Sequence, residues 1–385
     1  MWSRAIQLPS IPLLLAAACL VPEAPAQEAP LSPGSVNINL PPNGPLALIN
    51  YSMSDSRTSA RGAAMIVELH MSLALKNSSP DRIHGVTLRV VSQEVTPGGK
   101  SWVTIPSLNV GPGEAFPVRI DMQLMRPSQT AAGPLVQVDL DGVLFQGLSF
   151  FGPDRLNSRR TMTASEIQAQ RDREHFKRIL AQNGKPALQR EILESMARQA
   201  EPQLSVTVKR SGRAVTMAAV PGERTAEFAF LQIPDSPVAP IEGWTQLAGN
   251  EVRAPHINVR NNSAKPVKHV EMGWVVSDSS GRQYMAASVP SGDATLNLPP
   301  GQTARVDQET SLSFTSKGQP VNVQKMMGFV NQVEFADGKI WVPDRRHLEN
   351  AVLQRVLPPS DEELRLTEIY RRRGIDGLAQ ELAKF

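Results

Sequence analysis

An internal repeat is the feature that most constrains how this chain of 385 residues folds. Four short segments of the first half recur in the same order in the second half. The matching pairs are Asn77-Ser78-Ser79 with Asn261-Asn262-Ser263, Gly113-Glu114 with Gly301-Gln302, Asp141-Gly142 with Asp337-Gly338, and Asp154-Arg155 with Asp344-Arg345. The separation is 184 residues for the first pair and 188 for the second. Ordered matches with small changes of separation predict a duplicated unit whose loops vary in length.

Alternating hydrophobicity indicates that each copy is built from β-strands. Residues 65–75 carry apolar side chains at every second position, and residues 118–124 alternate in the same way, as expected for antiparallel strands with one buried face. Clusters of Gly, Pro and Asn separate such runs at turn-like spacing. The predicted fold class is mainly β with helical appendages, comprising two duplicated Ig-like antiparallel β-sandwich modules, each followed by a helical hairpin.

Helix signals follow each predicted sandwich. Residues 163–182 form an amphipathic segment that ends at Asn183-Gly184, and a second helix is expected from Pro186 to Gln199. Near the C-terminus a capping box at 360–363 opens a helix that stops at Gly374 and is followed by a last short helix. The predicted segments are a signal peptide at 1–26, a Pro-rich linker at 27–34, sandwich 1 at 35–160, hairpin 1 at 161–200, sandwich 2 at 201–346 and the C-terminal hairpin at 347–385.

The apolar face of such short hairpins needs a cover. We favour packing of each hairpin on its own sandwich, and the alternative is docking on a partner or on the other module. Tyr370, Arg371, Arg372 and Arg373 are candidate partner-docking residues under that alternative. A solvated helix end, placed favourably against the helix dipole, is the simpler interpretation of the three arginines.

The N-terminal 26 residues have the pattern of a secretory signal peptide. Arg4 precedes an apolar run at 11–21, and an Ala-Pro-Ala cleavage site lies at 24–26. The apolar run is too short to span a bilayer, which takes about 20 residues. We therefore expect an exported protein, periplasmic or extracellular. The alternative is a membrane-anchored lipoprotein, because the segment ending at Cys19 resembles a bacterial lipobox and would make Cys19 a lipidation site.

A short part of each copy resembles a known group of modules. Residues 257–263 (INVRNNS), followed by Val270, Ser277-Asp278 and Gly281, are similar to the strand-turn-strand opening of bacterial secreted Ig-like modules of the FxLYD and CARDB type. Those families have β-sandwich folds and are adhesive or uncharacterised. The resemblance therefore implies the fold and transfers no functional residue.

Motifs that carry chemistry are absent from the sequence. The six histidines form no pattern, and His70 occupies the polar register of its predicted strand. Asp141-Gly142 and Asp337-Gly338 fit hairpin turns better than calcium sites. Asp154-Arg155 and its repeat are expected to form ion pairs that anchor the hairpins. We predict no catalytic residue, cofactor or metal.

The composition of the chain indicates which classes of partner it can bind. Lys and Arg number 40 against 37 Asp and Glu, a formal net charge of +3, which offers little attraction for nucleic acid. Trp102 and Trp244 are expected near loops, and one of Trp274 and Trp341 in a core. Glycan binding by exposed aromatic rings stays open.

These observations lead to one expected function and two alternatives. We expect a non-catalytic exported cell-envelope protein that binds or scaffolds another envelope protein, with membrane contact only through lipidation at Cys19. The first alternative is an assembly or chaperone-like factor that pairs a sandwich edge with a partner strand. The second is a hydrolase with its site between the modules.

Overall fold

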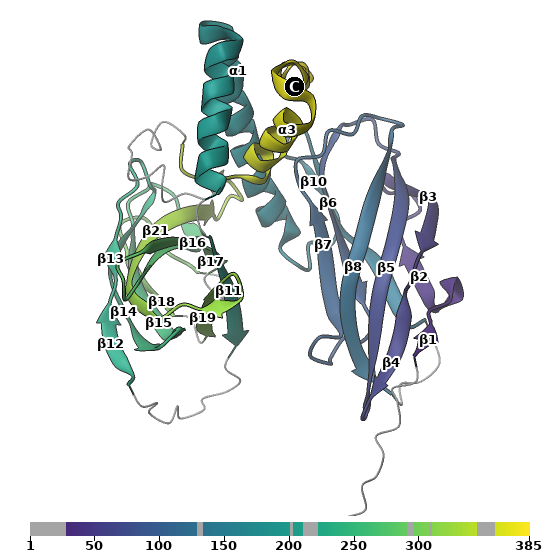
Figure 1. Cartoon of the computed structure of the whole chain (residues 1–385), viewed down its shortest axis with the longest axis horizontal. Helices are drawn as coiled ribbons and strands as arrows, with labels where there is room; N and C mark the ends of the chain where they lie inside the picture. The colour runs from purple at the N-terminus through teal and green to yellow at the C-terminus, as the bar shows by residue number, and fades with distance from the viewer. Residues whose placement is uncertain are drawn as a thin grey trace, which may run out of the picture.

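The computed structural model describes residues 28–128, 134–200, 203–210, 222–290, 296–307, 310–344 and 359–385. It is mainly β with helical appendages, which confirms the predicted fold class. Figure 1 shows module 1 (residues 28–157) and module 2 (residues 203–344) on opposite sides, with the helices α1 and α3 between them. The predicted signal peptide, with Cys19, and the predicted boundary between residues 346 and 347 lie outside the described residues.

Module 1 consists of two facing sheets. The elements are β1 (Ala29–Pro30), the 3-10 helix η1 (Pro33–Ser35), β2 (Val36–Asn39), β3 (Leu46–Met53), β4 (Arg57–Arg61), β5 (Ala64–Asn77), β6 (Ile83–Val91), β7 (Lys100–Ile105), β8 (Ala115–Pro127), β9 (Val136–Phe145) and β10 (Phe150–Phe151). One sheet contains β1, β4, β5, β3 and β8, and the other contains β10, β9, β6, β7 and β2. The alternation predicted in β5 is confirmed, because Val67, Leu69 and Leu73 point into the core between the sheets.

Module 2 has the same two-layer plan but its sheets are joined. The strands are β11 (Gln203–Arg210), β12 (Arg224–Glu227), β13 (Ala229–Phe230), β14 (Val238–Ala248), β15 (Glu251–Asn261), β16 (Val267–Asp278), β17 (Gln283–Pro290), β18 (Thr303–Asp307), β19 (Thr310–Ser316), β20 (Gln319–Pro320), β21 (Val323–Phe335) and β22 (Ile340–Trp341). Strand β11 pairs with β19 in one layer and with β17 in the other, so that a single path of hydrogen-bonded strands runs through both layers.

The first repeated motif folds identically in both modules. The Asn77 side chain donates from Nδ2 to the carbonyls of Asp81 at 2.9 Å and Val110 at 3.1 Å, and its Oδ1 accepts the backbone N–H of Ser79 at 2.9 Å. Asn261 makes the equivalent three bonds at 2.8, 2.9 and 2.9 Å. Both amides are fully buried. The repeat is therefore conserved in hydrogen bonding as well as in sequence.

The third repeated motif was aligned wrongly. Asp337-Gly338 forms the expected turn between β21 and β22, with Gly338 at φ +78°. Asp141-Gly142 instead lies inside β9, where the buried Asp141 carboxylate accepts the backbone N–H groups of Arg155 at 2.9 Å and Leu156 at 3.3 Å. The equivalent turn in module 1 runs from Gln146 to Leu148 and joins β9 to β10, with Leu148 at φ +62° in the place of Gly338.

The predicted ion pair at the start of hairpin 1 takes another form. The Asp154 carboxylate accepts the backbone N–H of Arg159 at 2.9 Å, in the first turn of α1, and the backbone of Arg155 is held by Asp141. The anchor is thus a pair of carboxylates that bind backbone N–H groups where the chain enters the helix. Arg345, in the second copy, lies outside the described residues.

Both helices double back at a glycine. In α1 (Ser158–Gln199) the backbone at Gly184 has φ 76° and ψ −178°, and in α3 (Asp361–Leu382) Gly374 has φ 66° and ψ −168°. His175 Nε2 lies 3.1 Å from Glu191 Oε1, although sixteen residues of straight helix would separate them by about 24 Å. Each element is therefore a hairpin of two antiparallel helices.

The two hairpins bury apolar faces against each other, and the N-terminal part of α1 also packs on its own sandwich, beside β6 and β9. The favoured expectation about their cover is therefore right for that part of α1 and wrong for the faces that the hairpins share. Six buried side chains form the centre of the contact, which we term the helical cluster. They are Phe176, Leu188, Ile192, Leu366, Leu378 and Leu382. These residues form three pairs that are each 190 residues apart in the sequence. The duplicated hairpins thus bury equivalent faces against one another, as the subunits of a symmetric dimer do.

Candidate functional site

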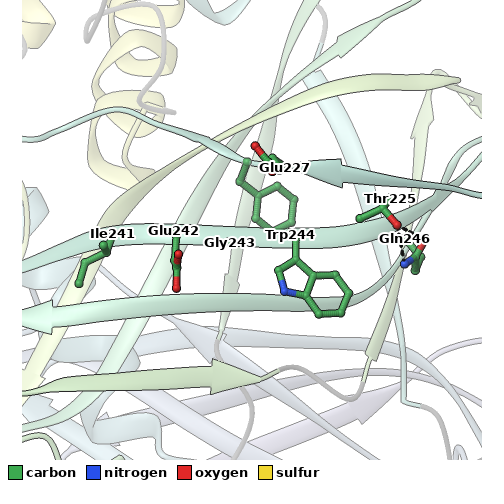
Figure 2. Close-up of a pocket in the computed structure, with 8 residues that line it drawn as sticks. Thr225, Glu227, Ile241, Glu242, Gly243, Trp244 and Gln246 are labelled. Carbon is green, nitrogen blue, oxygen red and sulfur yellow. Dashed lines mark hydrogen bonds between the residues drawn. The ribbon is translucent and has the colours of Figure 1, made fainter.

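A groove on module 2 has the features of a binding surface. Its volume is about 760 Å³, and it lies along the edge strand β12 and its neighbour β14. The lining residues are Thr225, Glu227, Phe228, Ile241, Glu242, Gly243, Trp244 and Gln246. Figure 2 shows Ile241 and Glu242 at one end, Trp244 in the middle and the Thr225–Gln246 pair at the other end.

A local irregularity of β14 exposes the apolar side chains. The register of β14 against β15 shifts between Pro240 and Glu242, so Ile241 is an extra residue without a ladder partner. Such a bulge breaks the strict alternation of faces. Ile241 and Glu242 are consequently both exposed, and 52% of Ile241 is accessible to solvent.

Trp244 is the largest exposed group in the groove. Its exposed fraction is 40%, and its ring packs against His256 of β15 with 4.1 Å between centroids and 43° between planes. Hydrogen bonds also fix the neighbouring polar side chains. Gln246 Nε2 donates to Thr225 Oγ1 at 3.0 Å, and Asn258 Nδ2 donates to Glu242 Oε1 at 2.6 Å. The groove therefore presents an indole that is packed in place before any ligand arrives, beside an exposed isoleucine.

The charged side chains that line the groove are both acidic. Glu227 and Glu242 are the charged residues among the eight that line it, and neither Lys nor Arg is among them. An acidic rim beside apolar side chains suits a ligand that carries both apolar and basic groups. Sequence reasoning missed this site, because the bulge that exposes Ile241 has no signal of its own in the sequence.

The residues singled out from the sequence lie elsewhere. Tyr370 packs partly buried against the helical cluster. Arg371 and Arg372 are exposed and lie 3.5 and 2.6 Å from Glu368 on the same helix, and the hydrogen bond from Arg372 is the main reason that the pKa of Glu368 falls below its ordinary value. Arg373 is exposed, with Nη2 3.3 Å from Gln380 Oε1. Their role in docking stays a prediction.

The aromatic and histidine expectations are partly corrected. Both tryptophans expected near loops lie on strands: Trp102 is the third residue of β7 and so close to a loop, whereas Trp244 lies well inside β14. Trp274 is in the core of module 2, with 2% of its surface exposed, as expected for one of the strand tryptophans. His70 lies on the solvent side of β5, with Nδ1 3.0 Å from Asp121 Oδ1. In the part of the chain that the structure describes, no group of three or more His, Cys, Asp or Glu could hold a metal ion.

Comparisons with known proteins do not identify a family. No protein-family model and no curated protein matches the chain. A putative ApaA protein from Bordetella pertussis is 16% identical over 37% of this chain and 89% of its own, with a TM-score of 0.18. A β-glucosidase from Kluyveromyces marxianus is 10% identical over 70% of this chain and 45% of its own, with a TM-score of 0.15. Neither similarity supports an inference about function. Among the described residues, no helix is long and apolar enough to cross a membrane.

Proposed function

We propose that the chain is a non-catalytic, exported protein of the bacterial cell envelope that binds an extended segment of another protein in the groove of module 2. The observation that supports this most directly is the half-exposed pair Ile241 and Trp244 beside two glutamates. A strand laid along this groove would run beside β12, the edge of its sheet, and strand addition of this kind supplies affinity through the main chain and specificity through side-chain pockets.

A protein segment suits the groove better than a glycan. Glycan platforms need a broad, open aromatic face, and here the indole of Trp244 is packed against His256 while an aliphatic side chain, Ile241, provides the other apolar contact. The predicted occupant is therefore an extended peptide that alternates apolar and basic side chains.

The long edge of module 1 is a weaker candidate for strand pairing. Strand β8 pairs with β5 along thirteen residues, but its exposed positions carry Pro117, Arg119 and Asp121. Proline and charged side chains are the usual protection of an edge strand against pairing. The assembly alternative is therefore better placed at the groove than at this edge.

A peptide-display selection against residues 27–385 tests the groove. We expect recovered peptides to alternate apolar and basic residues and to lose affinity at least tenfold, about 1.4 kcal/mol, on the Trp244→Ala variant. Trp102→Ala is the matched control, because Trp102 is 58% exposed on module 1. Equal losses in the two variants, or selection of glycans and no peptides in a parallel array, would contradict the proposal.

Export is tested separately by the N-terminus of the protein made in a bacterial host. Cleavage at the predicted site yields a chain that begins at Gln27. A chain that begins at a lipid-modified Cys19 would show that the lipoprotein alternative is right, and an uncleaved cytosolic chain would contradict export altogether. Mass spectrometry of the intact protein distinguishes the three.

A further inference from the structure

A second cavity lies where module 1, α1 and the C-terminal end of the described chain meet. Its volume is about 280 Å³, close to the lower end of the range of small-molecule sites, about 300 Å³. Its walls come from three parts of the sequence that are far apart. Arg82, His84, Asn109 and Gln146 belong to module 1, Arg173 and Lys177 to α1, and Lys384 to the segment after α3.

Two buried side chains make this cavity polar. His84 is 4% exposed; its Nδ1 lies 2.8 Å from Glu166 Oε1, while its Nε2 has no hydrogen-bond partner among the described residues. Arg173 is equally buried and donates from Nη2 to Glu166 Oε1 at 2.6 Å. A buried imidazole nitrogen without a partner costs free energy unless a ligand or water reaches it.

The cavity has more positive than negative charge. Four of its lining residues are Arg or Lys, and one, the exposed Glu174, is acidic. Arg173 and Lys384 have carboxylates of their own, since Lys384 Nζ donates to Glu381 Oε2 at 2.7 Å and Arg173 pairs with Glu166. Neither Arg82 nor Lys177 has a carboxylate partner within the described parts of the chain.

The two remaining cations are available to a ligand. Arg82 donates from Nη1 to the side-chain oxygen of Asn109 at 2.8 Å, a neutral partner that leaves its charge uncompensated. Lys177 has no hydrogen-bond or ion-pair partner within the described part of the chain. Converging cations of this kind, together with neutral amide donors such as Gln146, are the usual surroundings of a bound carboxylate or phosphate.

We propose that this cavity binds a small anion that carries two or more carboxylate or phosphate groups, and that the ligand links the C-terminal hairpin to module 1. Arg82 and Lys177 supply the charge, and the side-chain amide of Gln146 supplies a further hydrogen bond. The site is independent of the module 2 groove, because it shares no residue with it.

Isothermal titration with pyrophosphate and with citrate tests the proposal, against sodium chloride at the same ionic strength. We expect at least one of the two to bind, and the stronger of them shows whether phosphate or carboxylate is preferred. Lys177→Gln should weaken binding at least about tenfold, and it should leave the fold intact because Lys177 has no partner to lose. Arg178→Gln is the control, since Arg178 is the adjacent exposed cation.

Hydrogen exchange of residues 361–385 gives a second readout. A ligand that bridges the hairpin and module 1 must leave before the hairpin can open. At a ligand concentration 100 times the Kd, exchange that requires this opening should slow about 100-fold. Failure of both anions to bind above the chloride control would overturn the proposal, and so would equal affinity of the Lys177→Gln protein. Binding without added protection of residues 361–385 would overturn the linking role.

Discussion

Two buried asparagines carry the clearest structural role of any single residues in this chain. Asn77 and Asn261 each close the same turn by satisfying two carbonyls and one backbone N–H. No other side chain of similar size offers two donors and an acceptor in this arrangement. This explains why the motif appears twice in the sequence although the surrounding residues differ.

The Asn77→Ala substitution should destabilise module 1 by about 2–3 kcal/mol, because it leaves buried backbone groups without partners. Urea unfolding of the variant measures the loss. Asn39→Ala is the control, since Asn39 is exposed and its side chain donates to Asp139 Oδ1 at 3.1 Å, and its effect should stay within about 0.5 kcal/mol. Similar losses in both variants would show that the turn does not depend on the buried amide.

Residue roles were the level at which sequence reasoning was least complete. The motif at Asn77 was recognised as a turn, but its hydrogen bonds could not be known, since Val110 lies far along the chain. Asp141 was interpreted as a turn residue from its glycine neighbour, whereas burial in β9 makes it an anchor for the entry to α1. A local sequence pattern can identify a turn residue, but it does not reveal which distant residue its side chain bonds to.

At the level of elements, one glycine in each hairpin permits the reversal. The backbone of Gly374 adopts a conformation, φ 66° and ψ −168°, that is essentially restricted to glycine. A methyl group there would meet no atom within 4 Å, so any cost of Gly374→Ala is backbone strain alone. We expect a loss of about 1–3 kcal/mol in chemical unfolding.

Gly34→Ala is the matched control for this experiment, because its methyl group also meets nothing within 4 Å and its φ is not positive. The control should change stability by less than about 1 kcal/mol. If Gly374→Ala is equally neutral, the hairpin reverses without needing the left-handed conformation.

The ion pairs of α3 make its attachment sensitive to acid. Burial raises the pKa of Glu381, but hydrogen bonds from Lys384 and Arg365 outweigh this and place it below its ordinary value of 4.5. The pKa of Arg365 is raised in turn: burial alone would lower it, and its bonds to Glu362 and Glu381 more than compensate. A carboxyl whose pKa is lower in the folded state stabilises the fold above its unfolded pKa and loses that contribution as the pH falls through the folded pKa.

The Glu381→Gln protein should therefore be less stable than the unchanged protein at neutral pH, and the difference should shrink as the pH falls below about 4.5, the ordinary pKa of glutamate. Unfolding midpoints measured from pH 7 to pH 3 for both proteins test this. The difference between the two proteins reports on Glu381 alone. Asp361 is present in both, and its pKa is raised by burial, so its effect on stability has the opposite pH dependence and cancels. A difference that does not change with pH would contradict the assignment.

At the level of the whole molecule, the helical cluster connects the two modules. Hairpin 1 also contacts both of them: Arg160 Nη1 lies 3.6 Å from Glu334 Oε2 of module 2, and Met162 is buried beside Gly85 of module 1. Ser360, which caps α3 by accepting the N–H of Glu363, donates to Asp172 of α1 at 2.5 Å. The arrangement in Figure 1 is thus held by contacts between sequence-distant helices.

Leu378→Ala should loosen this connection and cost about 2–5 kcal/mol, since it creates a cavity in the cluster. Small-angle scattering should show a larger radius of gyration as the modules move apart. Leu364→Ala, at a position on the same helix that is 41% exposed, should cost less than about 0.5 kcal/mol and leave the scattering unchanged. An unchanged radius in both proteins would mean that other contacts hold the modules.

The sequence by itself determined the duplicated plan, the alternating strands, the capping box at Ser360 and the glycine reversals, because each depends on residues that are neighbours in the chain. The tertiary structure alone decided that equivalent hairpins bury each other, that a bulge exposes Ile241 beside Trp244, and that Arg82 meets Lys177 and Lys384 in one cavity. These outcomes depend on which surfaces and strands meet after the elements have formed, and no local pattern in the sequence reveals which ones do.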